Sequence, residues 1–134
     1  MALVVPNLGE RRILEYIVGK TSPGTFKLRL YTNSVDLSDE SFLTSNFTEA
    51  TDASYDEASL TAGNWTASTN GSGVTTLSYE TGITFTFGAG ADVQGYYVVN
   101  SAGETLWAEE FPGAPFSLPS GGGEIVIRPQ LQLN

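Results

Sequence analysis

The chain of 134 residues contains no cysteine and no histidine. Without cysteine it can form no disulfide and no thiolate metal site, and without histidine it lacks the most common general base and transition-metal ligand. It also has no apolar run near the roughly 20 residues that a membrane-spanning helix needs. The start, MALVVPNLGE, has no basic region before its short apolar run, so we expect no signal peptide and synthesis in the cytosol.

Positive charge is scarce over most of the sequence. The net charge is −9, and no Lys or Arg lies between Leu30 and Ile127, whereas thirteen of the fifteen acidic residues do. Binding to nucleic acid is disfavoured, because affinity for phosphates depends on Lys and Arg. The basic residues in the first 29 positions are either internal counterions for the acidic surface or a docking patch for an acidic partner.

The first part of the chain predicts an extended apolar arm over residues 1–6 and a helix over 8–18. Asn7 followed by Glu10 matches a capping box, and Gly19 stands where a helix should end. Four apolar residues share one face of this helix: Ile13, Leu14, Ile17 and Val18. A helix of about three turns is not stable alone, so we expect this apolar face to dock on the rest of the protein.

The remainder, residues 25–133, has the pattern of short strands separated by turns. In the strand at 25–32 the apolar residues alternate with Lys27 and Arg29, which predicts a half-buried strand with a basic outer face that also carries Tyr31. The strands that we expect span residues 25–32, 54–60, 64–69, 74–80, 83–87, 93–99, 104–110 and 124–133. Residues 33–54 read as a long polar loop.

Prolines and glycines limit the last part of this pattern. Residues 112–123 hold three prolines and a glycine triplet and cannot form a central strand, while Pro129 predicts an edge or a bulge. Seven or eight short strands at this spacing are typical of a β-sandwich or small barrel. We therefore predict an all-β, single-domain protein over residues 1–134 with one short amino-terminal α-helix.

Carboxylates are the only plentiful groups with catalytic potential. Glu109 and Glu110 are adjacent on a predicted strand and would point to opposite faces, so they cannot flank one scissile bond. We therefore expect no enzymatic activity, no cofactor and no metal site. The acidic stretches at 36–40 and 52–57 leave a structural calcium as the alternative to a solvated loop, although neither matches the twelve-residue calcium loop.

The segment from 93 to 110 is predicted to be a hairpin, with Gly103 at positive φ in its turn. Tyr96 and Tyr97 are adjacent, so one should face inward and the other outward. These aromatic residues either fill a core or form an exposed platform for a sugar or a partner protein. In the second case Trp65 and Tyr97 would be the platform.

Four stretches resemble a group of small structural virion proteins of tailed bacteriophages, including phages of cyanobacteria. They are LVVPNLGERRILEYIVGK, GNWT, GYYVVNSAGETLWAEEF and EIVIRPQLQL. The resemblance covers nearly the whole chain. It implies a capsid decoration, or cement, protein: a jelly-roll-like β-sandwich on the shell, often as a trimer. The alternative is a tail or fibre component that binds a host surface glycan or a neighbouring tail protein.

On this interpretation the amino-terminal segment and the basic strand contact the major capsid protein or another virion protein. We predict an apolar arm of Leu3, Val4 and Val5, with an ordinary first strand as the alternative. The basic residues expected to pair with acidic groups of the partner are Arg11, Arg12, Lys27 and Arg29. We expect a homo-oligomer located in the virion, with neither nucleic acid nor membrane as a partner.

Overall fold

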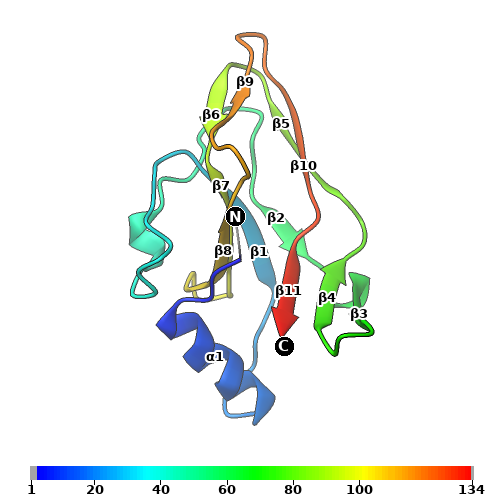
Figure 1. Cartoon of the computed structure of the whole chain (residues 1–134). Coiled ribbons are helices and arrows are strands. Elements are labelled where there is room, and N and C mark those ends of the chain that lie inside the picture. The colour runs from blue at the N-terminus through cyan, green and yellow to red at the C-terminus, as the bar shows by residue number, and fades with distance from the viewer. Residues whose placement is uncertain (1–2, 134) are drawn as a thin grey trace.

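The computed structural model describes residues 3–133 and contains one α-helix followed by eleven short strands within that range. The helix is α1 (Asn7–Ile17), and two 3-10 turns, η1 (Thr44–Asn46) and η2 (Ala62–Asn64), lie in the connections. The strands are β1 (Phe26–Tyr31), β2 (Ala58–Leu60), β3 (Trp65–Thr69), β4 (Thr75–Tyr79), β5 (Ile83–Phe87), β6 (Ala91–Val93), β7 (Gly95–Val99), β8 (Thr105–Glu110), β9 (Phe116–Leu118), β10 (Gly123–Ile127) and β11 (Gln130–Leu133). The prediction of a mostly β chain with one short amino-terminal helix is confirmed (Figure 1).

The paired strands are antiparallel and form four small sheets in the described part of the chain. β2, β1, β7 and β8 make a four-stranded sheet in that order, β11, β4 and β3 make a three-stranded sheet, and β10–β5 and β6–β9 are two-stranded. Four pairings are nested, because β7 pairs with β8, β6 with β9, β5 with β10 and β4 with β11. Residues 75–133 thus run along one side of a long ribbon and return along the other (Figure 1).

The turn between β7 and β8 closes this ribbon as the sequence predicts. Gly103 has φ of 80° and its N–H donates to the carbonyl of Asn100 at 3.0 Å. The ribbon is irregular between the β5–β10 pairing and the β4–β11 pairing. Four residues, 79–82, separate the paired residues Ser78 and Ile83, whereas only two, 128 and 129, separate their partners Ile127 and Gln130. Pro129 lies in this interruption between β10 and β11, next to the edge strand β11, which agrees with the expectation that it is not in a central strand.

The main hydrophobic cluster lies on one face of the four-stranded sheet. Leu28 and Leu30 of β1 and Trp107 of β8 pack there with Phe85 of β5 and Ile125 of β10. These residues alternate along their strands with side chains of the other face, as a pleated strand requires. The alternating pattern in the sequence therefore identifies the inward side of β1 and β5.

A second cluster covers the opposite face of the same sheet, which the sequence predicts to be a basic outer face. Tyr31 and Tyr97 are 1% and 2% exposed. The loop between β1 and β2 covers them with Leu37, Phe42 and Phe47. Tyr31 is therefore not an outward residue, because apolar side chains of the loop fold over it.

The helix begins and ends close to the predicted residues, but its start differs in chemistry. Pro6 occupies the N-cap and no side chain caps the helix, so the predicted capping box of Asn7 and Glu10 is wrong. Proline fits this place because the first backbone N–H groups of a helix have no intrahelical partner. At the other end Gly19 has φ of 72°, which confirms the predicted stop.

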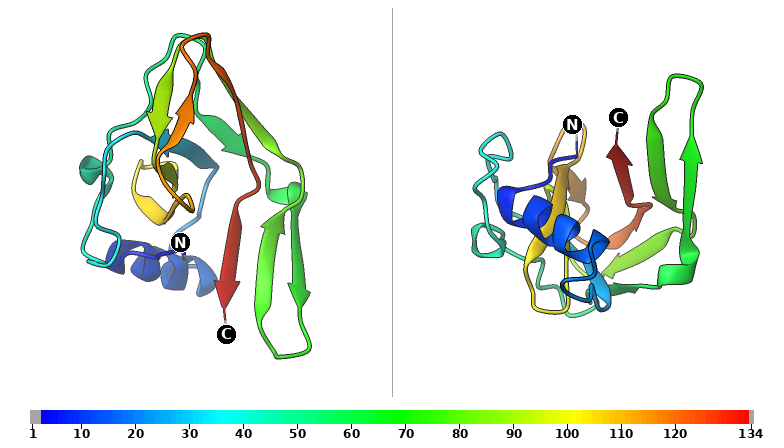
Figure 2. Two further views of the ribbon diagram at one scale, coloured as in Figure 1. Left: turned by 45° about the horizontal axis from the view of Figure 1, so that its top comes forward. Right: turned by 90° about the horizontal axis from the view of Figure 1, so that it is seen from below.

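Two elements are absent from the sequence prediction, one is shorter than predicted, and the strand predicted over residues 124–133 is divided into β10 and β11. β6 and β9 are three-residue strands that pair with each other, next to the Pro- and Gly-rich segments. β2 covers Ala58–Leu60 only, at one edge of the four-stranded sheet. The turn of the β3–β4 hairpin projects from the rest of the molecule (Figure 2). The hairpin is tied to the ribbon through the pairing of β4 with β11.

Candidate interaction surface

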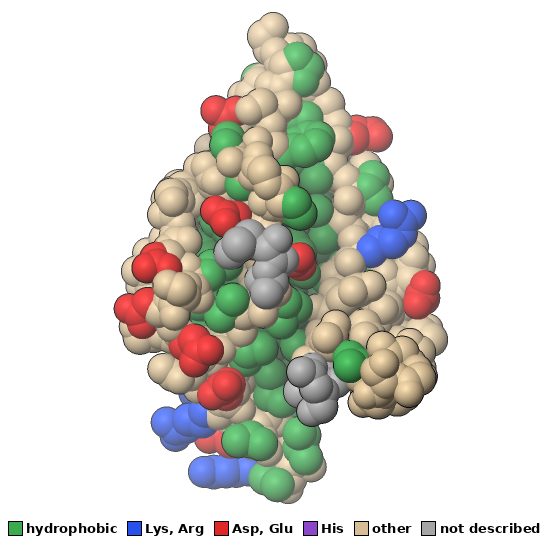
Figure 3. Space-filling model, viewed as in Figure 1, with side chains coloured by type: hydrophobic (Ala, Val, Ile, Leu, Met, Phe, Trp, Pro, Cys, Tyr) green, Lys and Arg blue, Asp and Glu red, His purple; other side chains and the backbone are tan. Residues whose placement is uncertain are grey.

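The outward side of α1 is apolar. Leu14, Ile17 and Val18 are 64%, 73% and 76% exposed, and we call these three residues the α1 ridge. Hydrophobic side chains gather at the lower end of the molecule, over α1, next to basic side chains (Figure 3). Single exposed apolar residues are ordinary on protein surfaces, whereas a contiguous group marks an interaction surface.

The prediction that the apolar face of the helix docks on the protein is wrong for this ridge. Instead, α1 lies against β8 through Gly9, whose added Cβ would stand 2.2 Å from the carbonyl oxygen of Leu106. On the same side the Tyr16 hydroxyl accepts a hydrogen bond of 3.0 Å from Asn100. The side that packs is therefore partly polar, and most of the apolar stripe is left outside.

An ion-pair network holds this polar side in place. Arg12 donates to both carboxylate oxygens of Glu104, at 2.9 Å and 2.8 Å, and to Glu15 at 2.8 Å. Arg11 donates to the other oxygen of Glu15 at 3.1 Å. Two parallel bonds between guanidinium and carboxylate fix direction as well as distance. Since Glu104 precedes β8 and Arg12 lies on α1, this contact sets the orientation of the helix.

The hydrogen bond from Arg12, together with one from Asn100, holds the pKa of Glu104 below the ordinary value for glutamate. A carboxyl group whose pKa is lower in the folded state stabilises the fold above its unfolded pKa, which is about 4.3 for glutamate. That stability is lost as the pH falls through the lower, folded pKa. We therefore expect the Tm to drop below about pH 4, and Glu104→Gln to show a smaller drop.

Thermal unfolding followed by circular dichroism from neutral to acidic pH measures this effect. Glu124→Gln is the matched control, because Glu124 is exposed on β10 and makes no ion pair within residues 3–133. The control should follow the wild type at every pH. Parallel curves for Glu104→Gln and the wild type would contradict a stabilising role of the Arg12–Glu104 pair.

An apolar groove runs beside the ridge, between α1 and the sheet that contains β11. It encloses about 390 Å³, and its lining includes Ile13, Tyr16, Trp65, Leu77 and Leu131. A second hollow of about 360 Å³ continues it past Val5. β11 is an edge strand of its sheet, so no described strand pairs with its second side. The ridge and the groove together form one apolar surface.

The described part of the predicted arm, residues 3–6, lies along β8 through Val4, and residues 1 and 2 lie outside the described residues. Val4 and Ala108 exchange two backbone hydrogen bonds, of 2.8 Å and 2.9 Å. Leu3 and Val5 are half-buried and pack against the main cluster. The arm therefore has the contacts of a short edge strand, which is the alternative left open by the sequence, and its contact with a partner stays a prediction.

The four predicted basic contact residues each face an acidic group of the chain itself. Arg29 donates to Glu57 at 2.6 Å, and Lys27 lies 3.3 Å from the same carboxylate. Arg11 and Arg12 belong to the α1 network, so the structure places the four residues in two separate groups on α1 and β1. These pairs correspond to the internal counterions considered from the sequence. Arg11, with 68% of its side chain exposed, is the one most open to a partner.

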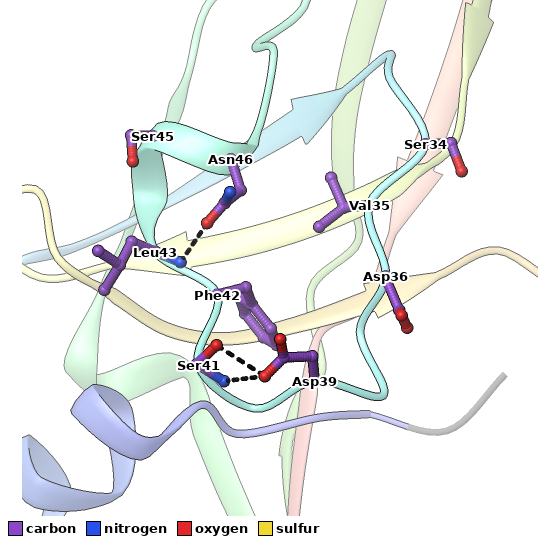
Figure 4. A pocket seen from close by; sticks show the side chains of 9 residues that line it. All are labelled: Ser34, Val35, Asp36, Asp39, Ser41, Phe42, Leu43, Ser45 and Asn46. Carbon is purple, nitrogen blue, oxygen red and sulfur yellow. Dashed lines mark hydrogen bonds between the residues drawn. The ribbon is translucent and has the colours of Figure 1, made fainter.

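The acidic loop at 36–40 borders a hollow of about 450 Å³ (Figure 4). Asp39 accepts bonds from the hydroxyl and the N–H of Ser41, at 2.6 Å and 3.0 Å, and Asp36 is bound in the same way by Ser38. These bonds lower the pKa of both aspartates. Within residues 3–133 no three acidic side chains gather where they could hold a metal ion. The carboxylates of this loop thus stabilise the loop itself.

The second acidic stretch is also used within the fold. Asp52 accepts hydrogen bonds from the N–H groups of Ser54, Gly88 and Ala89. The bonds from Gly88 and Ser54 are the main reason that the pKa of Asp52 is low. Asp52 thereby ties its loop to the turn after β5.

The proposed aromatic platform of Trp65 and Tyr97 is not formed. Tyr97 is buried and stacks on Phe47 with ring centres 4.4 Å apart, because the loop after β1 covers it. Tyr96 is buried on the other face, where its hydroxyl donates to Glu109 at 2.7 Å. Trp65 is half-buried and packs against Trp107, with the two ring centres 6.2 Å apart. The hairpin aromatics therefore fill the two hydrophobic clusters.

Comparisons of the chain with protein-family models, with curated proteins and with solved structures gave no match. Within the described range, α1 is far too short to cross a bilayer, and no helix there is a candidate membrane span.

Proposed function

We propose that the chain is a non-enzymatic structural protein of a tailed-bacteriophage virion, which decorates the capsid and stabilises the shell through contacts with the major capsid protein or another virion protein. The observation that carries the proposal is the exposed apolar surface of α1, formed by the ridge and the groove beside it. Such a surface is typical of protein–protein recognition. The resemblance in sequence supplies the class of virion protein.

The strand pairing supports a finer assignment of the fold, a jelly-roll-like β-sandwich. A jelly roll is built from eight strands in two sheets. Here β4 to β7 pair with β8 to β11 in nested order, which is the pairing of one hairpin ribbon wrapped into a double layer. The two hydrophobic clusters on either side of β1 and β7 support a rigid scaffold of this kind.

The predicted contact residues are part of the same proposal. Of Leu3, Val4 and Val5, the last lines the hollow that continues the groove beside α1. Arg11 and Arg12 lie on α1, and acidic groups of the shell would compete with Glu15 for them. Lys27 and Arg29 form the second basic group. A homo-oligomer, such as the trimer that the resemblance implies, would repeat both basic groups around its symmetry axis.

Quantitative mass spectrometry of purified virions tests the proposed location. A decoration protein covers the shell, so its copy number should be comparable with that of the major capsid protein. A copy number far below that value would contradict capsid decoration and favour the alternative, a tail or fibre component. If the protein were absent from purified virions, a structural role in the particle would be contradicted.

Binding to empty shells tests the contact surface. Removal of residues 1–6 is expected to weaken co-sedimentation with shells, because it deletes the arm beside the α1 surface. Circular dichroism must show that the shortened protein is folded, since Val4 also bonds to β8. Val126→Ser is the control, because Val126 is a half-exposed apolar residue on β10. Unchanged binding by the folded, shortened protein would exclude the arm from the contact.

A further inference from the structure

The α1 ridge is bounded by two opposite charges. Glu10 is exposed at the start of the helix and has no ion pair within residues 3–133. Lys20 follows the helix stop at Gly19, and its side chain is 67% exposed. The helix ends at Ile17, and the N–H of Lys20 donates back to the carbonyl of Glu15 at 2.9 Å, so Lys20 lies close to the carboxyl end of α1. The ridge residues Leu14, Ile17 and Val18 lie between them.

Both charges are available to a partner. The nearest carboxylate to Lys20 is that of Glu15, at 4.0 Å, and Arg11 and Arg12 already donate hydrogen bonds to its two oxygens. The Lys20–Glu15 pair is therefore at the limit of an ion-pair distance, while the two arginines lie closer to the same carboxylate, at 3.1 Å and 2.8 Å. The outward surface thus presents the unpaired carboxylate of Glu10, the apolar stripe and the largely exposed ammonium group of Lys20 in this order.

We propose that the α1 ridge binds the α1 ridge of a second copy of this chain, with the two helices antiparallel about a two-fold axis near Leu14. In a two-fold interface the same patch meets itself, so it must be self-complementary. The antiparallel arrangement brings Glu10 of each copy towards Lys20 of the other and forms this pair twice. It also places opposite ends of the two helix dipoles side by side.

Other arrangements fit the charges less well. Two parallel helices would bring Glu10 next to Glu10 and Lys20 next to Lys20, and like charges repel across such a contact. An unrelated partner would not require opposite free charges at the two ends of the ridge. The pairing rests on the proposed function in that both assign the α1 surface to protein contacts: the ridge would bind a second copy, and the groove and the hollow past Val5 would remain for the shell. The pairing is measured without shells.

Light scattering after size exclusion, across a wide range of protein concentration, measures the assembly. The expected species has a mass that is an even multiple of 14.3 kDa, either a dimer or paired trimers. A monomer, or a trimer that does not pair, at every concentration would overturn the inference. That result would leave the proposed function standing if the same protein still bound to shells.

Substitutions on the ridge test the apolar part. Ile17→Glu is expected to weaken the pairing by at least about tenfold, because a buried apolar side chain is replaced by a charge. Because Ile17 is 73% exposed in the single chain, we expect the variant to fold like the wild type. Val126→Glu, the same change at a half-exposed valine on β10, should pair like the wild type. Equal pairing by Ile17→Glu and the wild type would overturn the inference.

Charge reversal tests the antiparallel geometry. Glu10→Lys and Lys20→Glu should each weaken the pairing about fivefold, since each affects two symmetric ion pairs. The double variant restores both pairs with the charges exchanged and should pair like the wild type. Restoration by the double variant supports the antiparallel contact with a second copy. Additive weakening in the double variant would overturn it and favour an unrelated partner.

Discussion

Replacing Gly95 with alanine is expected to lower the free energy of unfolding by about 3 kcal/mol or more. Gly95 begins β7 and lies between Tyr31 of β1 and Glu110 of β8. An added Cβ would stand 2.1 Å from the carbonyl oxygen of Glu109 and 2.7 Å from the Tyr31 hydroxyl. Ordinary van der Waals contact begins at 3.4 Å, so the backbone of β8 would have to move by more than 1 Å. The change is costly because β8 is also held by α1 and by the arm.

Urea denaturation measures this loss, and Gly121→Ala is its matched control. A Cβ at Gly121 meets no atom within 4 Å, and its φ lies outside the left-handed region. The control should therefore differ from the wild type by less than about 0.5 kcal/mol. If Gly95→Ala were as stable as the control, β7 and β8 could not be packed as closely as the structure has them.

The start of the chain shows what a periodic pattern can predict and what it cannot. The apolar spacing predicts α1, and Gly19 predicts its end, because both depend on local geometry alone. Which side of the helix packs depends on Gly9 against Leu106 and on Arg12 against Glu104, and the second pair is 92 positions apart. No local pattern contains this information, so the spacing predicts burial for an apolar stripe that the structure leaves exposed.

The packing of the loop between β1 and β2 cannot be predicted from the sequence for a different reason. Its apolar residues Leu37, Phe42 and Phe47 have neither a two-residue nor a helical spacing, because the chain there is irregular. A segment of this kind reads as a polar loop. The same loop explains why the outer face of β1 is buried, since it covers Tyr31 and Tyr97 together with Val4 of the arm.

The candidate surface could be predicted in part. The sequence predicts both the apolar face and the basic residues of α1, and the stretch that resembles virion proteins includes the same segment. Their exposure was not predictable, because it follows from the way the helix is oriented on β8. The strands β6 and β9 were missed because three residues are too few to show alternation beside prolines and glycines.

Truncating the tryptophan beneath α1 is the second change with a large expected effect. Trp107 is 2% exposed, packs edge-on against Phe26 with ring centres 6.3 Å apart, and lines the groove beside α1. Trp107→Ala should lower the free energy of unfolding by about 3–5 kcal/mol, because it removes a large buried ring and leaves a cavity that its neighbours fill only in part. Urea denaturation followed by circular dichroism measures the loss.

The conservative variant Trp107→Phe separates packing from polar contributions. Its ring fills most of the same space, and the indole Nε1 of Trp107 has no hydrogen-bond partner among the described residues. Losing that N–H therefore removes a buried group without a partner, which partly offsets the smaller volume. We expect Trp107→Phe to lose about 1–2 kcal/mol, well below the alanine variant. Equal losses would mean that the indole N–H, and not the volume of the ring, stabilises the core beneath α1.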